Sequence, residues 1–284
     1  MIDRPPALLL AFAPGRRGNG TIDSETILSA EGLTRRFGGI TAVEGYDLRL
    51  AQGDLVGLIG PNGAGKTTVF NMLSGVLRPS AGGVAVNGQD LTGRPAHRFA
   101  RAGLARTFQN IRLFDDLNVF DNVMSGGHMR LGAGLWPTML QLPRFWRAEA
   151  AIRERAAGVV ELVGLGPHIG RRAGDLSYGD RRRVEIARAL ASDPQVLLLD
   201  EPAAGLNPSE TAGLTALIRE LVNRHGITVL LVEHDMRLVM ALCHRIQVLN
   251  RGRFVAEGAP REIQSDPAVI EAYLGTRRTR AGAA

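Results

Sequence analysis

Residues 54–68 join a short apolar run to a glycine-rich turn that contains the only lysine of the chain. The apolar run at 54–59 predicts a buried strand, and the pattern from Lys66 onward predicts a helix. Glycines let successive backbone N–H groups point at a chain of phosphates, and the helix adds its N-terminal dipole. We therefore expect a phosphate-binding loop made of Gly60, Pro61, Asn62, Gly63, Ala64, Gly65, Lys66, Thr67 and Thr68.

Lys66 is notable because the other 33 of the 34 basic residues are arginine. A compact ammonium on a flexible stem suits the terminal phosphates of a nucleotide, and the Thr67 hydroxyl suits Mg²⁺. Kinases, GTPases, helicases and transporters all carry such a loop. The class of protein must therefore be decided by the rest of the chain.

Two further apolar runs end in residues that could act on a bound phosphate. The run at 196–199 leads into Asp200 and Glu201, which predicts that Asp200 orients Mg²⁺ and Glu201 polarises the attacking water. The run at 227–232 leads into His234, and a helical pattern between the runs completes one strand-helix-strand unit. The acidic pair could alternatively cap a helix, and His234 could be a packed residue.

The segment before a helical pattern at 181–191 reads Asp-Leu-Ser-Tyr-Gly-Asp. It resembles the signature of the ABC ATPase family, which is usually Leu-Ser-Gly-Gly-Gln. Ser177 and Gly179 match this signature, whereas Tyr178 and Asp180 depart from it. In the family the signature reaches across a dimer to the γ-phosphate held by the other subunit, so the resemblance implies that Ser177 and Gly179 contact nucleotide. A capped helix start is the alternative.

The resemblance to the ABC ATPases extends over residues 27–275. It implies that Gln109 contacts Mg²⁺ and the attacking water, that His234 contacts the γ-phosphate, and that Phe37 stacks on adenine. Phe37 could equally be a core residue. Residues 205–207 resemble the loop that crosses the dimer interface in the family. As a whole, the resemblance implies ATP hydrolysis as the activity, with ATP and Mg²⁺ as cofactors.

The expected fold class is α/β, with a mostly parallel P-loop core sheet, an N-terminal antiparallel β subdomain and a helical subdomain. Antiparallel strands are predicted within 27–58 and 83–88, with a hairpin turn at Asn87-Gly88. Alternating strands and helices in the centre predict a parallel sheet. Residues 111–175 carry almost no strand pattern and contain both tryptophans, which predicts the helical subdomain. A last hairpin is expected at 246–257.

Length and composition limit the remaining choices. A chain of 284 residues with 45% hydrophobic content can bury a full core, and no apolar stretch approaches the roughly 18 to 20 residues of a membrane span. We expect one ATPase domain at 25–276, preceded by a disordered leader at 1–24 and followed by an Arg-rich tail at 277–284. The tail could be solvated or contact anionic lipid. The net charge of +6 comes from dispersed arginines, which does not favour nucleic acid as a partner, and the lone Cys243 agrees with a reducing cytoplasm.

Within the family, several strings resemble the LivG-type ATPases of branched-chain amino acid importers. They include Arg-Thr-Phe-Gln before Arg112, Tyr178 in the signature, and Glu-Pro-Ala-Ala-Gly-Leu-Asn-Pro from Glu201. Asp180 stands where a glutamine is expected. The resemblance implies a second ABC ATPase subunit, two membrane permeases, an extracytoplasmic solute-binding protein and a place on the cytoplasmic face of the bacterial inner membrane. Alternatives are a lipopolysaccharide exporter ATPase or a soluble, non-transport ABC ATPase.

Overall fold

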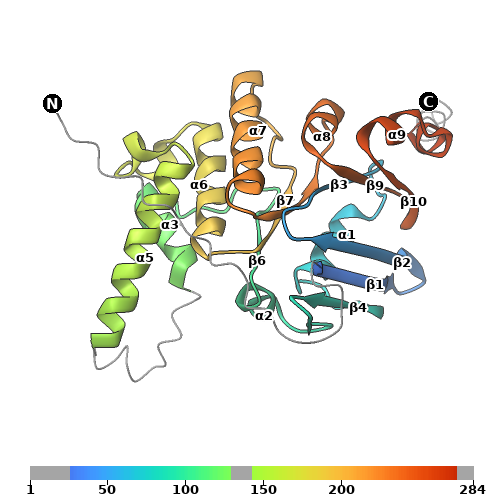
Figure 1. Ribbon diagram of the computed structural model, residues 1–284, viewed down its shortest axis with the longest axis horizontal. Helices are drawn as coiled ribbons and strands as arrows, with labels where there is room; N and C mark the ends of the chain where they lie inside the picture. The colour runs from blue at the N-terminus through green and yellow to red at the C-terminus, as the bar shows by residue number, and fades with distance from the viewer. Residues whose placement is uncertain (1–25, 129–142, 274–284) are drawn as a thin grey trace. The chain divides into compact units, whose positions relative to one another are not determined.

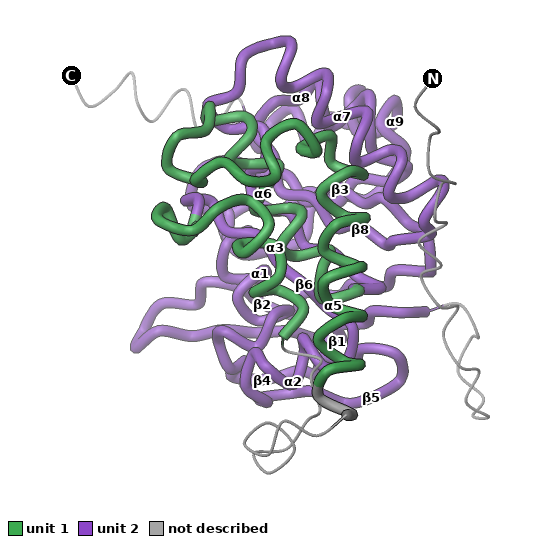
Figure 2. Tube along the Cα trace, turned by 90° about the vertical axis from the view of Figure 1, so that its left-hand side faces the viewer, with its two compact units in different colours: residues 1–20, 112–193 green, residues 21–111, 194–284 purple. Residues whose placement is uncertain are grey.

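The computed structural model describes residues 26–128 and 143–273, which fall into two compact units (Figures 1 and 2). One unit is helical and comprises the described residues of 112–193. The other unit contains both sheets and comprises the described residues of 26–111 and 194–273. The predicted leader at 1–24, Trp136 and the tail at 277–284 lie outside the described residues.

A six-stranded sheet forms the centre of the larger unit (Figure 1). Three of its strands, β3, β7 and β8, are buried at every residue, as the uniformly apolar runs predict. All neighbouring strands are parallel except the antiparallel edge pair β9 and β10, so the predicted mostly parallel core is confirmed. The order is β10 (Arg253–Gly258), β9 (Arg245–Asn250), β3 (Leu55–Ile59), β8 (Thr228–Val232), β7 (Val196–Asp200) and β6 (Leu104–Arg106).

The predicted antiparallel strands form a second, four-stranded sheet in the same unit. Its hairpin turn at Asn87-Gly88 has φ values of 52° and 72°, the left-handed conformation that a two-residue hairpin of this composition requires. The order is β2 (Ile40–Ala51), β1 (Thr26–Phe37), β4 (Ala81–Val86) and β5 (Gln89–Asp90).

Helix α1 (Lys66–Leu73) lies between the two sheets and joins them in one core. Its residues Val69, Phe70 and Leu73 are buried there, as their spacing predicts. The other face of the six-stranded sheet carries α7 (Pro208–Asn223) and α8 (Met236–Leu242) (Figure 1). The shorter helices are α2 (Ala96–Arg101) and α9 (Pro260–Ser265).

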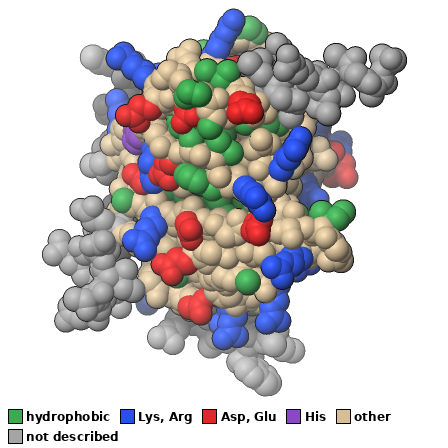
Figure 3. Space-filling view, turned by 90° about the vertical axis from the view of Figure 1, so that its right-hand side faces the viewer, with side chains coloured by type: hydrophobic (Ala, Val, Ile, Leu, Met, Phe, Trp, Pro, Cys, Tyr) green, Lys and Arg blue, Asp and Glu red, His purple; other side chains and the backbone are tan. Residues whose placement is uncertain are grey.

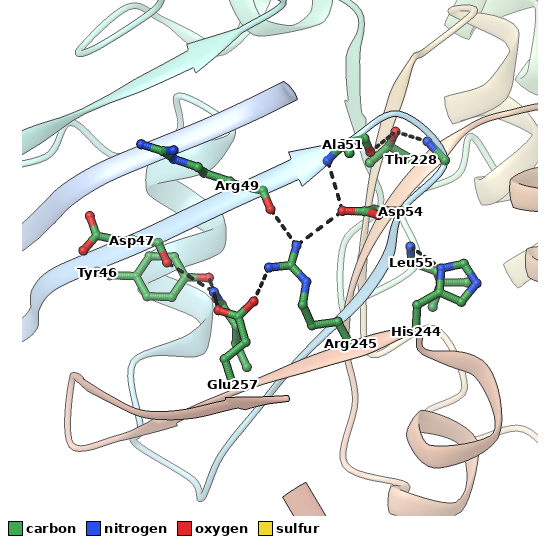
Figure 4. A network of polar contacts seen from close by, with 12 residues as sticks. Tyr46, Asp47, Arg49, Ala51, Asp54, Leu55, Thr228, His244, Arg245 and Glu257 are labelled. Atoms are coloured by element: carbon green, nitrogen blue, oxygen red, sulfur yellow. Dashed lines mark hydrogen bonds and ion pairs between the residues drawn. The ribbon is translucent and has the colours of Figure 1, made fainter. Parts of the chain in front are cut away.

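A polar network ties β9 of the core sheet to β2, an edge strand of the antiparallel sheet (Figure 4). Arg245, at the start of β9, donates to the carbonyl oxygen of Arg49 on β2 at 2.6 Å and pairs with Asp54 and Glu257. The buried Tyr46 hydroxyl on β2 donates to Gln247 Oε1 on β9 at 2.6 Å. Because these donors and acceptors are satisfied across the junction, the network fixes the antiparallel sheet on the core sheet.

The helical unit packs α3 (Val119–Gly127), α5 (Pro143–Leu162) and α6 (Tyr178–Ala191) against one another. Helix α6 begins three residues before the predicted start, because the Ser177 side chain caps it. Its Arg182 and Glu185 are buried and paired at 2.6 Å, although their charges alone predict exposure. Among the described residues, no helix is both long and apolar enough to span a bilayer.

Charges are mixed on the face of the molecule drawn in Figure 3. Basic and acidic side chains of described residues alternate over this face, and hydrophobic side chains appear between them (Figure 3). Binding to nucleic acid typically uses a continuous basic stripe, which this face does not present within the described residues.

Candidate active site

The predicted phosphate loop follows β3 and can only be built with glycine at two of its positions. Gly60 and Gly65 have φ values of 152° and 102°. A Cβ on Gly60 would lie 2.1 Å from the Leu249 carbonyl oxygen, and one on Gly65 would lie 2.8 Å from that of Ala42. Gly63, by contrast, faces open space, so its backbone is accessible to a ligand. Glycine at 60 and 65 therefore allows close packing against neighbouring backbone, and the backbone at Gly63 is open to a phosphate.

Lys66 lies inside this loop and holds it closed. Its Nζ donates to the carbonyl oxygens of Gly60 at 2.7 Å and Pro61 at 3.1 Å. Burial lowers the pKa of Lys66, and the negative charges of Glu201 and Asp200 oppose that shift. The structure thus places the single lysine near the carboxylates of Asp200, the last residue of β7, and Glu201, the residue after it.

Three residues predicted to be catalytic meet at the Glu201 carboxylate. Gln109 Nε2 donates to Glu201 Oε2 at 2.9 Å, and His234 Nε2 lies 2.6 Å from Glu201 Oε1. Glu201 has a φ of 47°, which is strained for a residue with a side chain and costs on the order of 1–3 kcal/mol. The backbone turn aims the carboxylate between the glutamine and the histidine, which suits a group that must orient a water molecule.

The oxygen donors predicted for Mg²⁺ fit this ion. Thr67 is exposed at the start of α1, and Asp200 ends β7 with a side chain only 6% exposed. In the described part of the chain no three His, Cys, Asp or Glu residues group as a complete metal site. Magnesium usually takes one or two protein oxygens together with substrate phosphates and water, so a hydroxyl and a carboxylate beside a phosphate loop are a suitable donor set.

Phe37 ends β1 at the hairpin that leads into β2, and it is 46% exposed. It is therefore not a core residue, and the alternative that placed it in the core is wrong. The Arg35 guanidinium lies 4.6 Å from the centre of its ring. An exposed aromatic face of this kind can stack on a flat heterocycle such as adenine.

The signature residues lie in the helical unit, at the start of α6. Ser177 Oγ accepts from the Asp180 N–H at 3.1 Å and donates to Asp180 Oδ2 at 3.0 Å. Gly179 is buried in the first turn. The alternative of a capped helix start is therefore confirmed as the local role of Ser177.

Sequence reasoning missed Glu233, which lies between β8 and His234. Its carboxylate is buried and accepts from the backbone N–H of Ala203 at 2.7 Å and of His234 at 3.1 Å. Burial raises the pKa of Glu233, and these N–H donors oppose that shift. Glu233 thereby joins the segment after β7 to the segment that carries the histidine. The only sequence signal was its place directly before His234.

Replacing Glu233 with alanine is expected to lower the free energy of unfolding by about 1–3 kcal/mol, because two part-buried backbone N–H donors lose their acceptor. Thermal denaturation of the purified chain measures this loss. Glu31→Ala is the matched control, because Glu31 is exposed and forms a surface ion pair with Arg49. A Glu233→Ala variant with the same melting temperature as the control would show that these hydrogen bonds do not stabilise the segments after β7 and β8.

Tyr273 is a second residue that sequence reasoning did not single out. Its phenol hydrogen-bonds the backbone of Gly60, the first glycine of the phosphate loop, and burial raises its pKa to about 12. The C-terminal segment therefore contacts the loop directly. No local pattern reveals this contact, since more than two hundred residues separate the partners.

Taken together, a phosphate loop after one buried strand, an Asp-Glu pair after a second and a histidine after a third define a P-loop ATPase of the ATP-binding-cassette class. The comparisons with known proteins agree with this class. The model of the ABC transporter family matches residues 43–204, and a model described as branched-chain amino acid ATP-binding cassette transporter matches residues 255–279. The chain belongs to the ABC transporter family as an ATP-binding, ATP-hydrolysing member.

Curated relatives align over nearly their whole length. The high-affinity branched-chain amino acid transport ATP-binding protein LivG of Escherichia coli is 49% identical over 89% of this chain and 99% of its own. The high-affinity branched-chain amino acid transport ATP-binding protein BraF of Pseudomonas aeruginosa is 47% identical over 89% of this chain and 99% of its own. The lipopolysaccharide export system ATP-binding protein LptB of Haemophilus influenzae is 36% identical over 88% of this chain and 98% of its own.

Solved structures show the same fold. The ADP conformation of an ATP-binding cassette of an ABC transporter aligns with a TM-score of 0.77 at 31% identity, covering 88% of this chain and 99% of that one. A nucleotide-free cassette aligns with a TM-score of 0.76 at 30% identity, covering 87% and 98%. The predicted fold class and family are therefore confirmed.

Proposed function

We propose that this chain is the ATPase subunit that energises an importer of branched-chain amino acids or related small polar solutes. The observation that carries the proposal is the likeness to LivG and BraF over almost the full length of all three chains. It is supported by the separate match of residues 255–279 to a model described for branched-chain amino acid transporters. The identity to LptB is lower, so an export role is the weaker candidate.

In this function the phosphate loop binds the triphosphate of ATP through its backbone amides and Lys66. Phe37 would stack on adenine, and Thr67, Asp200 and Gln109 would hold Mg²⁺. The ion, when bound, neutralises charge on the phosphate oxygens. Ser177 and Gly179 complete the site of a second subunit.

The geometry around Glu201 supports its role as the group that activates water. A water molecule that replaces Gln109 or His234 at the carboxylate is oriented toward the γ-phosphorus, and Glu201 takes up its proton as the new P–O bond forms. The bond to the β,γ-bridging oxygen breaks, so ADP and phosphate leave. His234, 2.6 Å from Glu201 in this structure, is placed to donate to the γ-phosphate when it turns from the carboxylate.

The proposed assembly has two ATPase subunits that close head to tail over two ATP molecules, together with two permeases and an extracytoplasmic solute-binding protein. We propose that residues 25–276 form one ATPase cassette, with the helical subdomain at about 111–175. The region around Gln109 then transmits the closing of the ATPase dimer to the permeases. The chain then works as a peripheral protein on the cytoplasmic face of the inner membrane.

Co-purification tests this assembly. A tagged chain, expressed in its native host and extracted in mild detergent, is expected to retain two multi-span permeases and a second ABC ATPase. ATP turnover of the reconstituted complex should rise with leucine and the binding protein. Recovery of lipopolysaccharide exporter subunits or ribosomes in place of permeases would overturn the proposal. The genes that flank this one provide an independent check.

Asp180 gives a prediction about the dimer. Its carboxylate lies in the first turn of α6, where it stabilises the helix but repels a γ-phosphate that approaches the same turn. Replacing Asp180 with glutamine is expected to tighten ATP-dependent dimerisation by roughly fivefold, the equivalent of about 1 kcal/mol.

Sedimentation of the chain with saturating ATP measures this effect, with Glu201→Gln in both proteins to slow turnover. Asp121→Asn is the control, because Asp121 also occupies the first turn of a helix, α3, outside the signature. Equal dimerisation of the Asp180→Gln protein and this control would contradict the prediction.

A further inference from the structure

Arg106 has an environment that the motif analysis does not explain. It is the last residue of β6, and its side chain is only 7% exposed. Arg106 Nη2 donates to Asp200 Oδ2 at 2.8 Å. Its Nη1 donates to Asn71 Oδ1 at 2.7 Å and to Ser74 Oγ at 2.9 Å, both at the C-terminal end of α1. One buried guanidinium thus connects β6, the helix of the phosphate loop and the acidic end of β7.

Two aromatic rings fix the plane of this guanidinium. The Cζ atom of Arg106 lies 5.6 Å from the centre of the Phe70 ring and 5.3 Å from that of Phe108. Such contacts are attractive for a cation over an aromatic face. Because the guanidinium is held by two rings and two α1 oxygens, it cannot follow the Asp200 carboxylate if that group rotates.

The bond to Arg106 is the only side-chain hydrogen bond that the Asp200 carboxylate makes within the described residues. Arg106 binds the Oδ2 atom of Asp200, so the Oδ1 atom is left for other ligands. Glu201 is held in the same way by Gln109, three residues beyond Arg106. The two consecutive carboxylates at the end of β7 therefore each accept a side-chain hydrogen bond from residues 106–109, at and just beyond the end of β6.

We propose that Arg106 is a positioning residue that fixes the Asp200 carboxylate for Mg²⁺. The inference rests on the proposed role of Asp200 as the carboxylate that orients the ion. Mg²⁺ demands near-ideal octahedral geometry, so a carboxylate whose rotation is blocked presents its free oxygen at less cost than a mobile one. Removing the outer partner of a metal ligand typically weakens metal affinity about 10- to 100-fold.

The test measures binding as well as turnover. Affinity for a fluorescent ATP analogue is titrated against Mg²⁺ concentration, and Mn²⁺ binding to the ADP complex is followed by electron paramagnetic resonance. The Arg106→Lys variant keeps the charge but cannot reach all three oxygens. The Mg²⁺ concentration that gives half of the maximal gain in affinity for the ATP analogue should therefore rise about 10- to 100-fold. Nucleotide affinity in excess EDTA should stay as in the unmodified protein.

Two further variants separate positioning from folding. Asn71→Ala removes one anchor of Arg106 without touching Asp200 and should raise the Mg²⁺ requirement by a smaller factor in the same direction. Arg245→Gln is the control, because Arg245 is also ion-paired (Figure 4) but begins β9, which is separated from β6 in the sheet by β3, β8 and β7. It should lower the melting temperature and leave the Mg²⁺ requirement unchanged.

The two possible failures are distinguishable. If the unmodified chain binds nucleotide with the expected Mg²⁺ dependence and both Arg106→Lys and Asn71→Ala match Arg245→Gln, the inference about Arg106 is wrong. If the unmodified chain itself shows no Mg²⁺ dependence, the proposed role of Asp200 fails first, and the inference fails with it.

Discussion

Replacing Glu201 with glutamine is expected to lower ATP turnover by about 10² to 10⁴-fold while ATP binding persists. The amide has nearly the shape of the carboxylate, so the local fold between Gln109 and His234 is kept. It cannot take up a proton from water, which removes the function proposed for Glu201. A loss in turnover without a loss in affinity is the kinetic sign of an interaction made only in the transition state.

The measurement is phosphate release under saturating Mg²⁺ and ATP, with affinity determined separately by a fluorescent analogue. Glu31→Gln makes the same chemical change at an exposed position on β1 and controls for the lost charge. Wild-type turnover in a folded Glu201→Gln protein would remove this residue from the catalytic role and leave His234 as the residue to test next.

The strands and their functional ends could be predicted from the sequence because each is a short, fully apolar run that stops at a residue of different chemistry. β7 contains the whole apolar run at 196–199 and ends one residue later, at Asp200, and α7 buries the five apolar residues that its spacing selects: Leu214, Leu217, Ile218, Leu221 and Val222. In both elements, the apolar residues that form the local pattern are the ones that the tertiary structure buries. The fold class follows from the alternation of such runs.

The missed residues are those whose surroundings come from distant parts of the chain. Arg106 and Asp200 are 94 residues apart, and only the parallel register of β6 and β7 makes them neighbours. Arg182 and Glu185 form a buried ion pair that nothing in their local sequence marks. Sequence periodicity reports which face of an element is apolar, but it does not report which charged side chains find a partner in the interior.

Lys66 provides the second large effect, because its ammonium is the only side-chain cation in the phosphate loop. Lys66→Ala is expected to weaken ATP binding by roughly 10- to 100-fold, given about 1.5–3 kcal/mol for a charge-assisted hydrogen bond to phosphate. The fluorescent analogue measures the loss. Arg78→Ala, which removes an arginine from outside the loop, is the control.

The single lysine also permits a chemical test on the unmodified protein. An amine-reactive label can modify only Lys66 and the terminal amine, and peptide mass spectrometry separates the two. The lowered pKa of Lys66 supplies more neutral amine at moderately alkaline pH than an ordinary lysine would, although burial slows the reagent. Because a bound triphosphate engages the ammonium, Mg²⁺ with ATP should protect Lys66 and leave labelling of the terminal amine unchanged. Equal labelling of Lys66 with and without nucleotide would show that this lysine does not contact the phosphates, and the assignment of the phosphate loop would then be wrong.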